Sequence, residues 1–334
     1  MDAPTTLRRF TRQLWGPLLM EPAAGLARAV RYLPRLRPED RGVDVTPDLA
    51  YGPDLWQRYD LYRPREPSGP LPLLMMIHGG GFQFFDRRSH WGVATAFARA
   101  GFVVASVEYR LAPHRFPAPQ RDVAAALLHL VRVAADHGAD ARRTVLAGES
   151  AGANLALGLA LCWTLPRPEP WAAAIAAADF ELRAILPACG YLDVTEPGRH
   201  EVYWRKRGRP LHPVVASRIP EVSRAHLPDH SPPLPEHALA SPLRLLEALA
   251  KGEHPSPLRP LPPVHALVGA VDPVLHDTLR LGAALEALGV DHEVPIYADA
   301  GHAFHALPWH RQAEPAWRGQ RAFLRRVLGA ADAS

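Results

Sequence analysis

The sequence predicts an α/β fold, in which helices flank a mostly parallel β-sheet. Three observations carry this prediction. Short strand-like segments alternate with longer segments whose apolar residues recur every three or four positions, as in helices. The segment 71–77 is an almost unbroken apolar run, as expected for a central strand covered on both faces. Finally, glycine, serine, aspartate and histidine motifs follow predicted strands directly, where such a sheet places its chemistry.

Length and composition limit the classes of protein that need to be considered. The 334 residues suffice for one large α/β domain with an insertion or for two smaller domains, and 48% hydrophobic with 22% charged residues is ordinary for a globular protein. The net charge of +4 is modest and the arginines are scattered among acids, which argues against a nucleic-acid partner. Cys162 and Cys189 predict two free thiols.

The chain shows no sign of a membrane-spanning segment or of a signal peptide. No apolar run approaches the ~18–20 residues that a membrane span requires. The apolar stretch near the N-terminus is short and lacks a clear cleavage site of small residues. We therefore expect a cytoplasmic protein without an integral membrane span.

The first hundred residues predict an N-terminal helical segment followed by the first strands. Apolar spacing within residues 1–45 fits one or two amphipathic helices, which we expect to pack at the mouth of the main domain. A helix lying on a membrane surface is the alternative, because its polar face carries arginines. Alternation over 54–63 predicts an antiparallel strand, and 71–77 is followed by a predicted helix at 93–100.

The regular alternation continues and is then interrupted once. The predicted elements after residue 100 are strands at 102–107, 144–147, 182–186, 264–268 and 292–297, and helices at 117–136, from 151, at 275–288 and at 314–328. Residues 195–255 are instead rich in proline and histidine, with short helices expected near 214–224 and 243–250. We interpret 195–255 as an insertion lying over the domain.

The segment Gly148-Glu149-Ser150-Ala151-Gly152 places a serine between two glycines where a predicted strand meets a helix. Such a turn strains the serine backbone and leaves room only for small neighbours. The start of the helix also offers N–H groups to an anion. This is the pattern of a nucleophile elbow, with a simple packing turn as the alternative.

Two further side chains complete a possible catalytic group. Asp272 and His302 lie on the loops after the last two predicted strands, in the chain order Ser, Asp, His. Attack by Ser150 on an ester or amide needs a base, here His302, and a carboxylate that orients the base, here Asp272. Asp277 is a nearby rival of Asp272, but it lies inside the following predicted helix.

A glycine-rich loop, His78-Gly79-Gly80-Gly81, follows the strand 71–77. Glycine lets the backbone turn its N–H groups towards a ligand, so we expect Gly80, Gly81 and Ala151 to form an oxyanion hole. A flexible turn or a phosphate loop is the alternative, but the residues of a phosphate loop do not follow. We expect His78 to anchor the loop by hydrogen bonding.

Together these motifs resemble the hormone-sensitive-lipase-like esterases, the bacterial family IV carboxylesterases of the α/β-hydrolase superfamily. The resemblance runs from about residue 55 to 327 and includes Glu108–Pro113, Asp122 and Ser241-Pro242-Leu243. It implies an eight-stranded, mostly parallel sheet and a helical cap formed by 1–45 and 195–255. The α/β core would then comprise 46–194 and 256–334.

The resemblance also implies an activity. We expect a serine carboxylesterase that hydrolyses small-molecule esters, with short to medium acyl chains, through an acyl-enzyme on Ser150. It would need no cofactor and no metal, and would be a monomer or a homodimer. The alternatives are the same triad acting on an aryl formamide, lactone or peptide, or a non-catalytic ligand receptor of the same fold. Receptors of that kind typically lack the catalytic histidine, whereas His302 is present.

Several positions depart from the family pattern. Glu149 replaces the usual aspartate, Ala153 stands where a third glycine is common, and Phe85 occupies a position that is often glycine. With Phe85, the side chains of Phe82, Phe84 and Trp91 could form an aromatic wall that binds substrate, and plain core packing is the alternative. We interpret His226, His230 and His237 as surface histidines, because their spacing matches no metal site.

Overall fold

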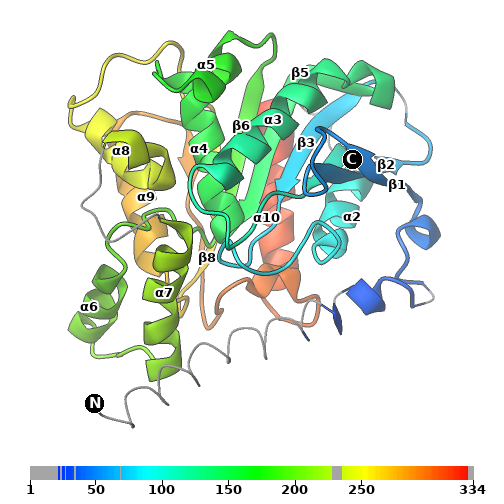
Figure 1. Cartoon of the computed structure of the whole chain (residues 1–334). Helices are drawn as coiled ribbons and strands as arrows, with labels where there is room; N and C mark the ends of the chain where they lie inside the picture. The colour runs from blue at the N-terminus through cyan, green and yellow to red at the C-terminus, as the bar shows by residue number, and fades with distance from the viewer. Residues whose placement is uncertain are drawn as a thin grey trace.

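The computed structural model describes residues 22, 25–26, 28–33, 35–67, 69–227 and 235–329. Within these residues the central sheet has eight strands in the order β1-β2-β4-β3-β5-β6-β7-β9 (Figure 1). The strands are β1 Val43–Ala50, β2 Arg58–Pro64, β3 Leu71–Ile77, β4 Val103–Val107, β5 Ala139–Glu149, β6 Leu182–Ala188, β7 Val264–His265, β8 Val268–Gly269, β9 His292–Glu293 and β10 Ile296–Tyr297. The predicted fold class, α/β with a mostly parallel eight-stranded sheet, is confirmed.

The pairing of the strands explains the sheet order. β2 pairs in antiparallel fashion with β1 on one side and with β4 on the other, whereas β4, β3, β5, β6, β7 and β9 are parallel. β8 and β10 continue β7 and β9 as a short parallel pair. The parallel strands therefore end at one edge of the sheet, and the loops that follow them meet there.

Helices cover both faces of this sheet (Figure 1). They are α2 Trp91–Arg99, α3 Ala118–Arg132, α4 Ala151–Thr164, α5 Pro170–Ala177, α6 Gly198–Lys206, α7 Pro213–His226, α8 Pro242–Ala250, α9 Leu275–Ala287 and α10 Ala313–Leu328. The helices α2 and α10 share one apolar cluster with the sheet, whereas α3, α4, α8 and α9 share another. Every predicted helix from 93–100 onward is present in this part of the chain.

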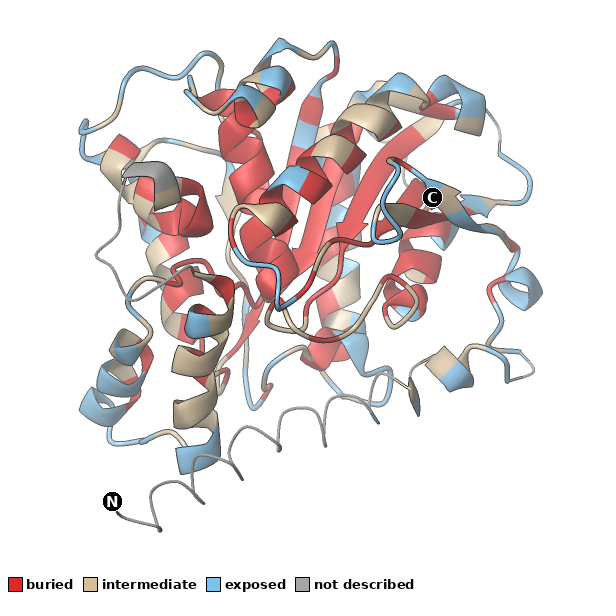
Figure 2. Ribbon diagram, viewed as in Figure 1, coloured by how far each residue is buried: buried red, intermediate tan, exposed pale blue. Residues whose placement is uncertain are grey.

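The central strand β3 divides its side chains between these two clusters. Leu73, Met75 and Ile77 belong to the cluster with α3 and α4, and Leu74 and Met76 to the one with α2 and α10. Side chains alternate between the faces of a strand, so a strand covered on both sides must be apolar at every position. Figure 2 shows β3 as buried along most of its length, which confirms the prediction for 71–77.

Three elements were not predicted, namely β1, α5 and α6, and the physical reason is clear for β1 and α6. In β1 the register shifts between Thr46 and Leu49, and Asp48 has a φ of 61°, so the alternation that identifies a strand is broken. In α6 only His200 and Trp204 are buried, so its apolar stripe is too narrow to recognise.

The described residues of 195–255, the region predicted to be an insertion, contain three α-helices despite its prolines. Pro213 and Pro242 stand in the first turns of α7 and α8, where a missing N–H has no consequence. Both helices agree with the predicted 214–224 and 243–250. The helix α7 lies against the glycine loop, because a Cβ on Gly81 would lie 2.9 Å from Val222 Cγ2. Residues 228–234, which include His230, lie outside the described residues.

Most of the predicted N-terminal helical segment, including residues 1–21, also lies outside the described residues. Of the part that is described, Val30 and Leu36 pack against the α2 and α10 cluster, and Arg28 pairs with Asp86 at 2.6 Å. The division into cap and core therefore stays a prediction. No helix among the described residues has the length and apolar character needed to cross a membrane.

Candidate active site

Ser150 occupies the sharp turn between β5 and α4. Its backbone has a φ of 53° and a ψ of −111°, a conformation that residues other than glycine rarely adopt. A Cβ on Gly148 would lie 2.2 Å from the Gly152 carbonyl oxygen, and one on Gly152 would lie 2.1 Å from the Ile77 carbonyl oxygen. Both glycines are therefore required, and the strained turn predicted from the sequence is confirmed.

The three side chains proposed from their chain order lie together at the end of the sheet. His302 Nε2 is 3.0 Å from Ser150 Oγ, and His302 Nδ1 is 3.0 and 3.1 Å from the two Asp272 carboxylate oxygens. Asp272 is fully buried and also accepts the Val274 N–H at 2.9 Å. The His302 side chain is 38% exposed, so an external molecule can reach it.

The carboxylate of Asp272 controls the protonation of His302. Burial alone would lower the pKa of the imidazole. The charge and hydrogen bond of Asp272, together with the charge of Glu149, outweigh burial and raise the pKa of His302 from 6.5 to about 9. The arrangement therefore stabilises an imidazolium ion, and the bond to Asp272 fixes the Nδ1–H tautomer that leaves Nε2 free to accept a proton.

Asp277, the alternative candidate for the acid that orients His302, has a structural role in another part of the molecule. Its Oδ2 accepts the N–H groups of Leu192 and Asp193 at 2.8 and 3.1 Å, and its Oδ1 accepts from Arg199 at 2.6 Å. It thereby holds the segment that follows β6 onto α9. The preference for Asp272 as the partner of His302 agrees with this geometry.

The glycine loop after β3 adopts a backbone that requires glycine. Gly80 and Gly81 have φ angles of 105° and 62°, and a Cβ on Gly80 would lie 2.0 Å from the Phe84 carbonyl oxygen. Within the described part of the chain, the N–H groups of Gly80, Gly81 and Ala151 donate no hydrogen bond. These three donors are therefore available to a bound oxygen.

His78 anchors this loop, as predicted. Its ring is buried, Nε2 is 3.0 Å from Glu108 Oε1 and Nδ1 is 2.8 Å from the Gly79 carbonyl oxygen. The ring also stacks on Tyr109 with 4.4 Å between centroids. Glu108 in turn accepts from Arg87 at 3.2 Å, and Arg87 also donates to Asp60 in β2 at 2.9 Å, which ties the loop to the antiparallel strands.

A buried acid behind the elbow connects three loops. Glu149 lies between His90 Nε2 at 3.4 Å and His305 Nε2 at 3.3 Å. Burial alone would raise the pKa of Glu149, but the hydrogen bond and charge of His90 and the charges of His305 and His302 hold it at about 2. Sequence reasoning noted Glu149 and missed both histidines, although His305 stands only three residues after His302.

The four aromatic residues proposed to bind substrate have different surroundings. Phe82 is buried and stacks on His226 at 3.7 Å, while Trp91 lies in the core cluster of α2 and α10. Core packing, the alternative left open by the sequence, describes these two. Phe84 lies under the Arg218 guanidinium at 5.1 Å and the half-buried Phe85 meets the edge of the His90 ring at 5.8 Å. A substrate-binding role for Phe84 and Phe85 stays a prediction.

The interpretation of His226 as a surface histidine is wrong. His226 is fully buried at the end of α7, where its Nε2 is 3.0 Å from Gln120 Nε2. Burial lowers its pKa to about 3, so the ring is neutral. Stacking on Phe82 joins α7 to the glycine loop, a long-range contact that spacing along the chain could not reveal.

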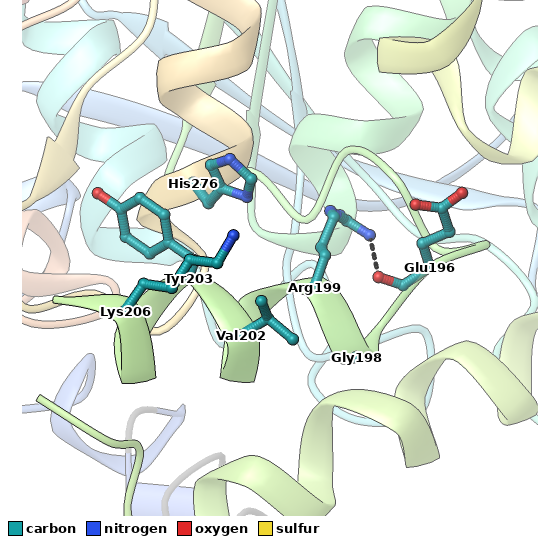
Figure 3. Close-up of a pocket in the computed structure, with 7 residues that line it drawn as sticks. All are labelled: Glu196, Gly198, Arg199, Val202, Tyr203, Lys206 and His276. Carbon is teal, nitrogen blue, oxygen red and sulfur yellow. Dashed lines mark hydrogen bonds between the residues drawn. The ribbon is translucent and has the colours of Figure 1, made fainter. Parts of the chain in front are cut away.

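A hollow of about 580 Å³ lies between α6 and the start of α9, apart from the triad (Figure 3). It is lined by Glu196, Gly198, Arg199, Val202, Tyr203, Lys206 and His276. The Tyr203 ring stacks on His276 at 4.6 Å. None of the triad side chains lines this hollow.

Among the described residues, Cys189, Asp272 and His302 are the one group of three ionisable side chains compact enough to hold a metal ion.

Comparisons with known proteins agree with this architecture. A family model described as the alpha/beta hydrolase fold matches residues 74–306. Esterase LipI of Mycobacterium tuberculosis is 30% identical over 273 residues, which cover 79% of this chain and 76% of LipI. Carboxylesterase NlhH of the same organism is 39% identical over 127 residues, 37% of each chain.

Solved structures resemble the whole fold. Esterase LipW from Mycobacterium marinum has a TM-score of 0.72 and 24% identity, and the alignment covers 94% of this chain and 90% of LipW. A bacterial heroin esterase has a TM-score of 0.70 and 24% identity, with 92% of this chain and 98% of that chain covered. At this level of identity the likeness concerns the fold alone.

Proposed function

The chain belongs to the α/β-hydrolase fold family, in its hormone-sensitive-lipase-like branch, and we propose that it is a serine carboxylesterase that forms an acyl-enzyme on Ser150. One observation carries the mechanism. His302 Nε2 lies 3.0 Å from Ser150 Oγ while Asp272 holds the opposite ring nitrogen. This is the geometry that a base needs to remove the serine proton.

In the acylation step Ser150 Oγ attacks the ester carbonyl carbon as its proton passes to His302 Nε2. The carbonyl oxygen becomes an oxyanion, which the N–H groups of Gly80, Gly81 and Ala151 are arranged to receive. The imidazolium formed on His302 is stabilised by Asp272 and then donates its proton to the departing alkoxide. The alcohol leaves, and the acyl group stays on Ser150.

Deacylation repeats these roles with water as the nucleophile. His302 removes a proton from the water that attacks the acyl carbon, and the same N–H groups receive the second oxyanion. The imidazolium returns its proton to Ser150 Oγ, and the carboxylic acid leaves. The proposal requires neutral His302 at the start of both steps, because an imidazolium cannot accept a proton.

The substrate class follows from the site and from the relatives. LipI is named an esterase and NlhH a carboxylesterase, which supports small carboxylic esters as substrates of this chain. A short to medium acyl chain is our proposal. The hydrogen bond between His302 and Ser150 disfavours a non-catalytic receptor. Aryl formamides, lactones and peptides remain alternative acyl substrates for the same triad.

Turnover of p-nitrophenyl esters across a series of acyl lengths tests the proposal, with wild type and Ser150→Ala compared side by side. We expect a maximum at short chains, inertness towards the matching p-nitroanilides, and a loss of about 10³-fold or more in Ser150→Ala. Folded wild-type protein that binds these esters without cleaving them would instead identify a receptor. Cleavage of anilides faster than esters would indicate an amidase.

A further inference from the structure

Cys189 lies beside the pair formed by Asp272 and His302. It follows β6, and its N–H donates to the Leu267 carbonyl oxygen at 2.8 Å. The Cys189 backbone has a φ of 40°, so the chain turns sharply at this residue. The sulfur, a carboxylate oxygen of Asp272 and a ring nitrogen of His302 all lie within 4.8 Å of one another. The proposed acyl-transfer mechanism has no use for this sulfur.

These three atoms are a donor set that a borderline-soft divalent cation prefers. Zinc takes thiolate sulfur, imidazole nitrogen and carboxylate oxygen, with bonds of ~2.0–2.3 Å. In the tetrahedral arrangement that zinc prefers, ligand atoms at these bond lengths lie about 3.4–3.6 Å apart. The three atoms, which lie within 4.8 Å of one another, would therefore move closer together by up to about 1.4 Å when an ion binds. A thiolate and a carboxylate would also neutralise the charge of the ion in a buried place.

We propose that Cys189, Asp272 and His302 form an inhibitory site for a thiophilic divalent cation such as Zn²⁺ or Cd²⁺. The ion would bind Nδ1, the ring nitrogen on the Asp272 side, in place of its proton. A neutral imidazole bound through Nδ1 carries its remaining proton on Nε2. That nitrogen faces Ser150 Oγ at 3.0 Å and can then no longer accept the serine proton.

The proton balance of this step is simple. The Cys189 thiol loses its proton to solvent when the sulfur–metal bond forms. Nδ1 also loses its proton, and Nε2 gains one, so that binding to the neutral imidazole releases one proton in total. Cys189 and Asp272 are fully buried, whereas the His302 side chain is 38% exposed. The ion therefore enters from the side of His302, which is also the side that substrate reaches.

The chain offers a matched control. Cys162 is a second buried free thiol, in α4, and among the described residues it belongs to no such group of ligands. Hydrolysis of a short p-nitrophenyl ester would be measured in wild type, Cys189→Ser and Cys162→Ser with Zn²⁺ or Cd²⁺ buffered by a chelator. We expect equal inhibition of wild type and Cys162→Ser, and about tenfold or more weaker inhibition of Cys189→Ser. Mg²⁺, which prefers oxygen ligands, should have no effect.

A second readout does not depend on turnover. Ser150→Ala protein titrated with Cd²⁺ should develop thiolate-to-metal absorption that the Ser150→Ala, Cys189→Ser double variant lacks. Circular dichroism and the melting temperature establish that each variant is folded, and Cys189→Ala serves if the serine variant is not. Absorption in Ser150→Ala protein, together with no ester hydrolysis by wild-type protein, would support the metal site while contradicting the proposed function. Equal inhibition or absorption in both cysteine variants, or none in wild type at millimolar ion, would overturn the proposal.

Discussion

Two histidines beside buried aspartates have opposite properties in this molecule. His302 lies 3.0 Å from Asp272, and its pKa is raised to about 9. His200 in α6 lies 3.7 Å from Asp277, and burial, followed by the charges of Arg199 and His276, lowers its pKa to about 2. Both aspartates are fully buried, so burial of the acid does not explain the difference.

The difference lies in what else each carboxylate binds. Asp272 directs both oxygens at His302. Asp277 accepts from Arg199 and from two backbone N–H groups, and Arg280 lies 3.8 Å away. Neither ring nitrogen of His200 has a hydrogen-bond partner within the described residues. A buried carboxylate therefore raises the pKa of a neighbouring histidine, and so makes it a base, only when the carboxylate is not already paired with arginine.

The largest effect is expected when Asp272 loses its charge. Asp272→Asn should lower kcat/KM by about 10⁴-fold, because an amide can favour the wrong imidazole tautomer. The melting temperature should change little in comparison. Steady-state kinetics on a short p-nitrophenyl ester, together with thermal unfolding, would measure both. An activity within tenfold of wild type would show that Asp272 does not orient His302.

The matching change at Asp277 should act on stability and leave the chemistry intact. Asp277→Asn removes the nearer carboxylate partner of the half-buried Arg199, which keeps only Asp193 at 3.6 Å, so the free energy of unfolding should fall by up to the about 3–5 kcal/mol typical of a broken buried ion pair. Denaturant unfolding would measure this loss. Activity per folded molecule should stay within a few-fold of wild type. A selective loss of kcat at unchanged stability would contradict the assigned structural task.

The pH dependence of activity follows from the raised pKa of His302. Because the base must be neutral, kcat/KM should rise with pH, and the apparent pKa of this rising limb of the pH profile should lie above 6.5, towards about 9. The Glu149 charge contributes to this rise in pKa. Glu149→Gln should therefore move the limb to lower pH, and Asp272→Asn should move it further. A limb that stays in place in Glu149→Gln would mean that this acid acts only on His90 and His305.

The smallest effect is expected at His200. Replacement by leucine removes two unpartnered ring nitrogens and should change the free energy of unfolding at neutral pH by about 1 kcal/mol or less. At acidic pH the direction of the effect of His200 on stability is defined. The unfolded chain binds a proton on His200 below about 6.5 and the folded chain does not, so this residue destabilises the fold as pH falls. Unfolding curves at several pH values should be less acid-sensitive in His200→Leu, with ester hydrolysis unchanged.

The sequence identified the features that are encoded locally. The serine turn, the glycine loop and the apolar strand 71–77 each depend on neighbouring residues, and the structure agrees with all three. Asp272 and His302 could be proposed because loops after parallel strands meet at one end of a sheet. The functional roles of these residues stay predictions until they are tested by mutation.

Features that depend on contacts between distant segments could not be predicted. The contacts of Glu149 with His90 and His305, and the stacking of Phe82 on His226, join segments that no spacing rule connects. The position of Cys189 is of the same kind, because it depends on the turn after β6 and on two loops more than 80 residues further along. The edge strand β1 was missed because its alternation is broken at Asp48.

Covalent labelling of Ser150 tests the central claim most directly. An alkyl p-nitrophenyl phosphonate reacts with an activated serine as an ester does, but the product is not hydrolysed. Intact-mass measurement followed by peptide mapping should find one adduct per chain, on Ser150, and none in Ser150→Ala. Labelling should be far slower in Asp272→Asn. An adduct on another residue, or no adduct on folded wild-type protein, would contradict an acyl-enzyme at this serine.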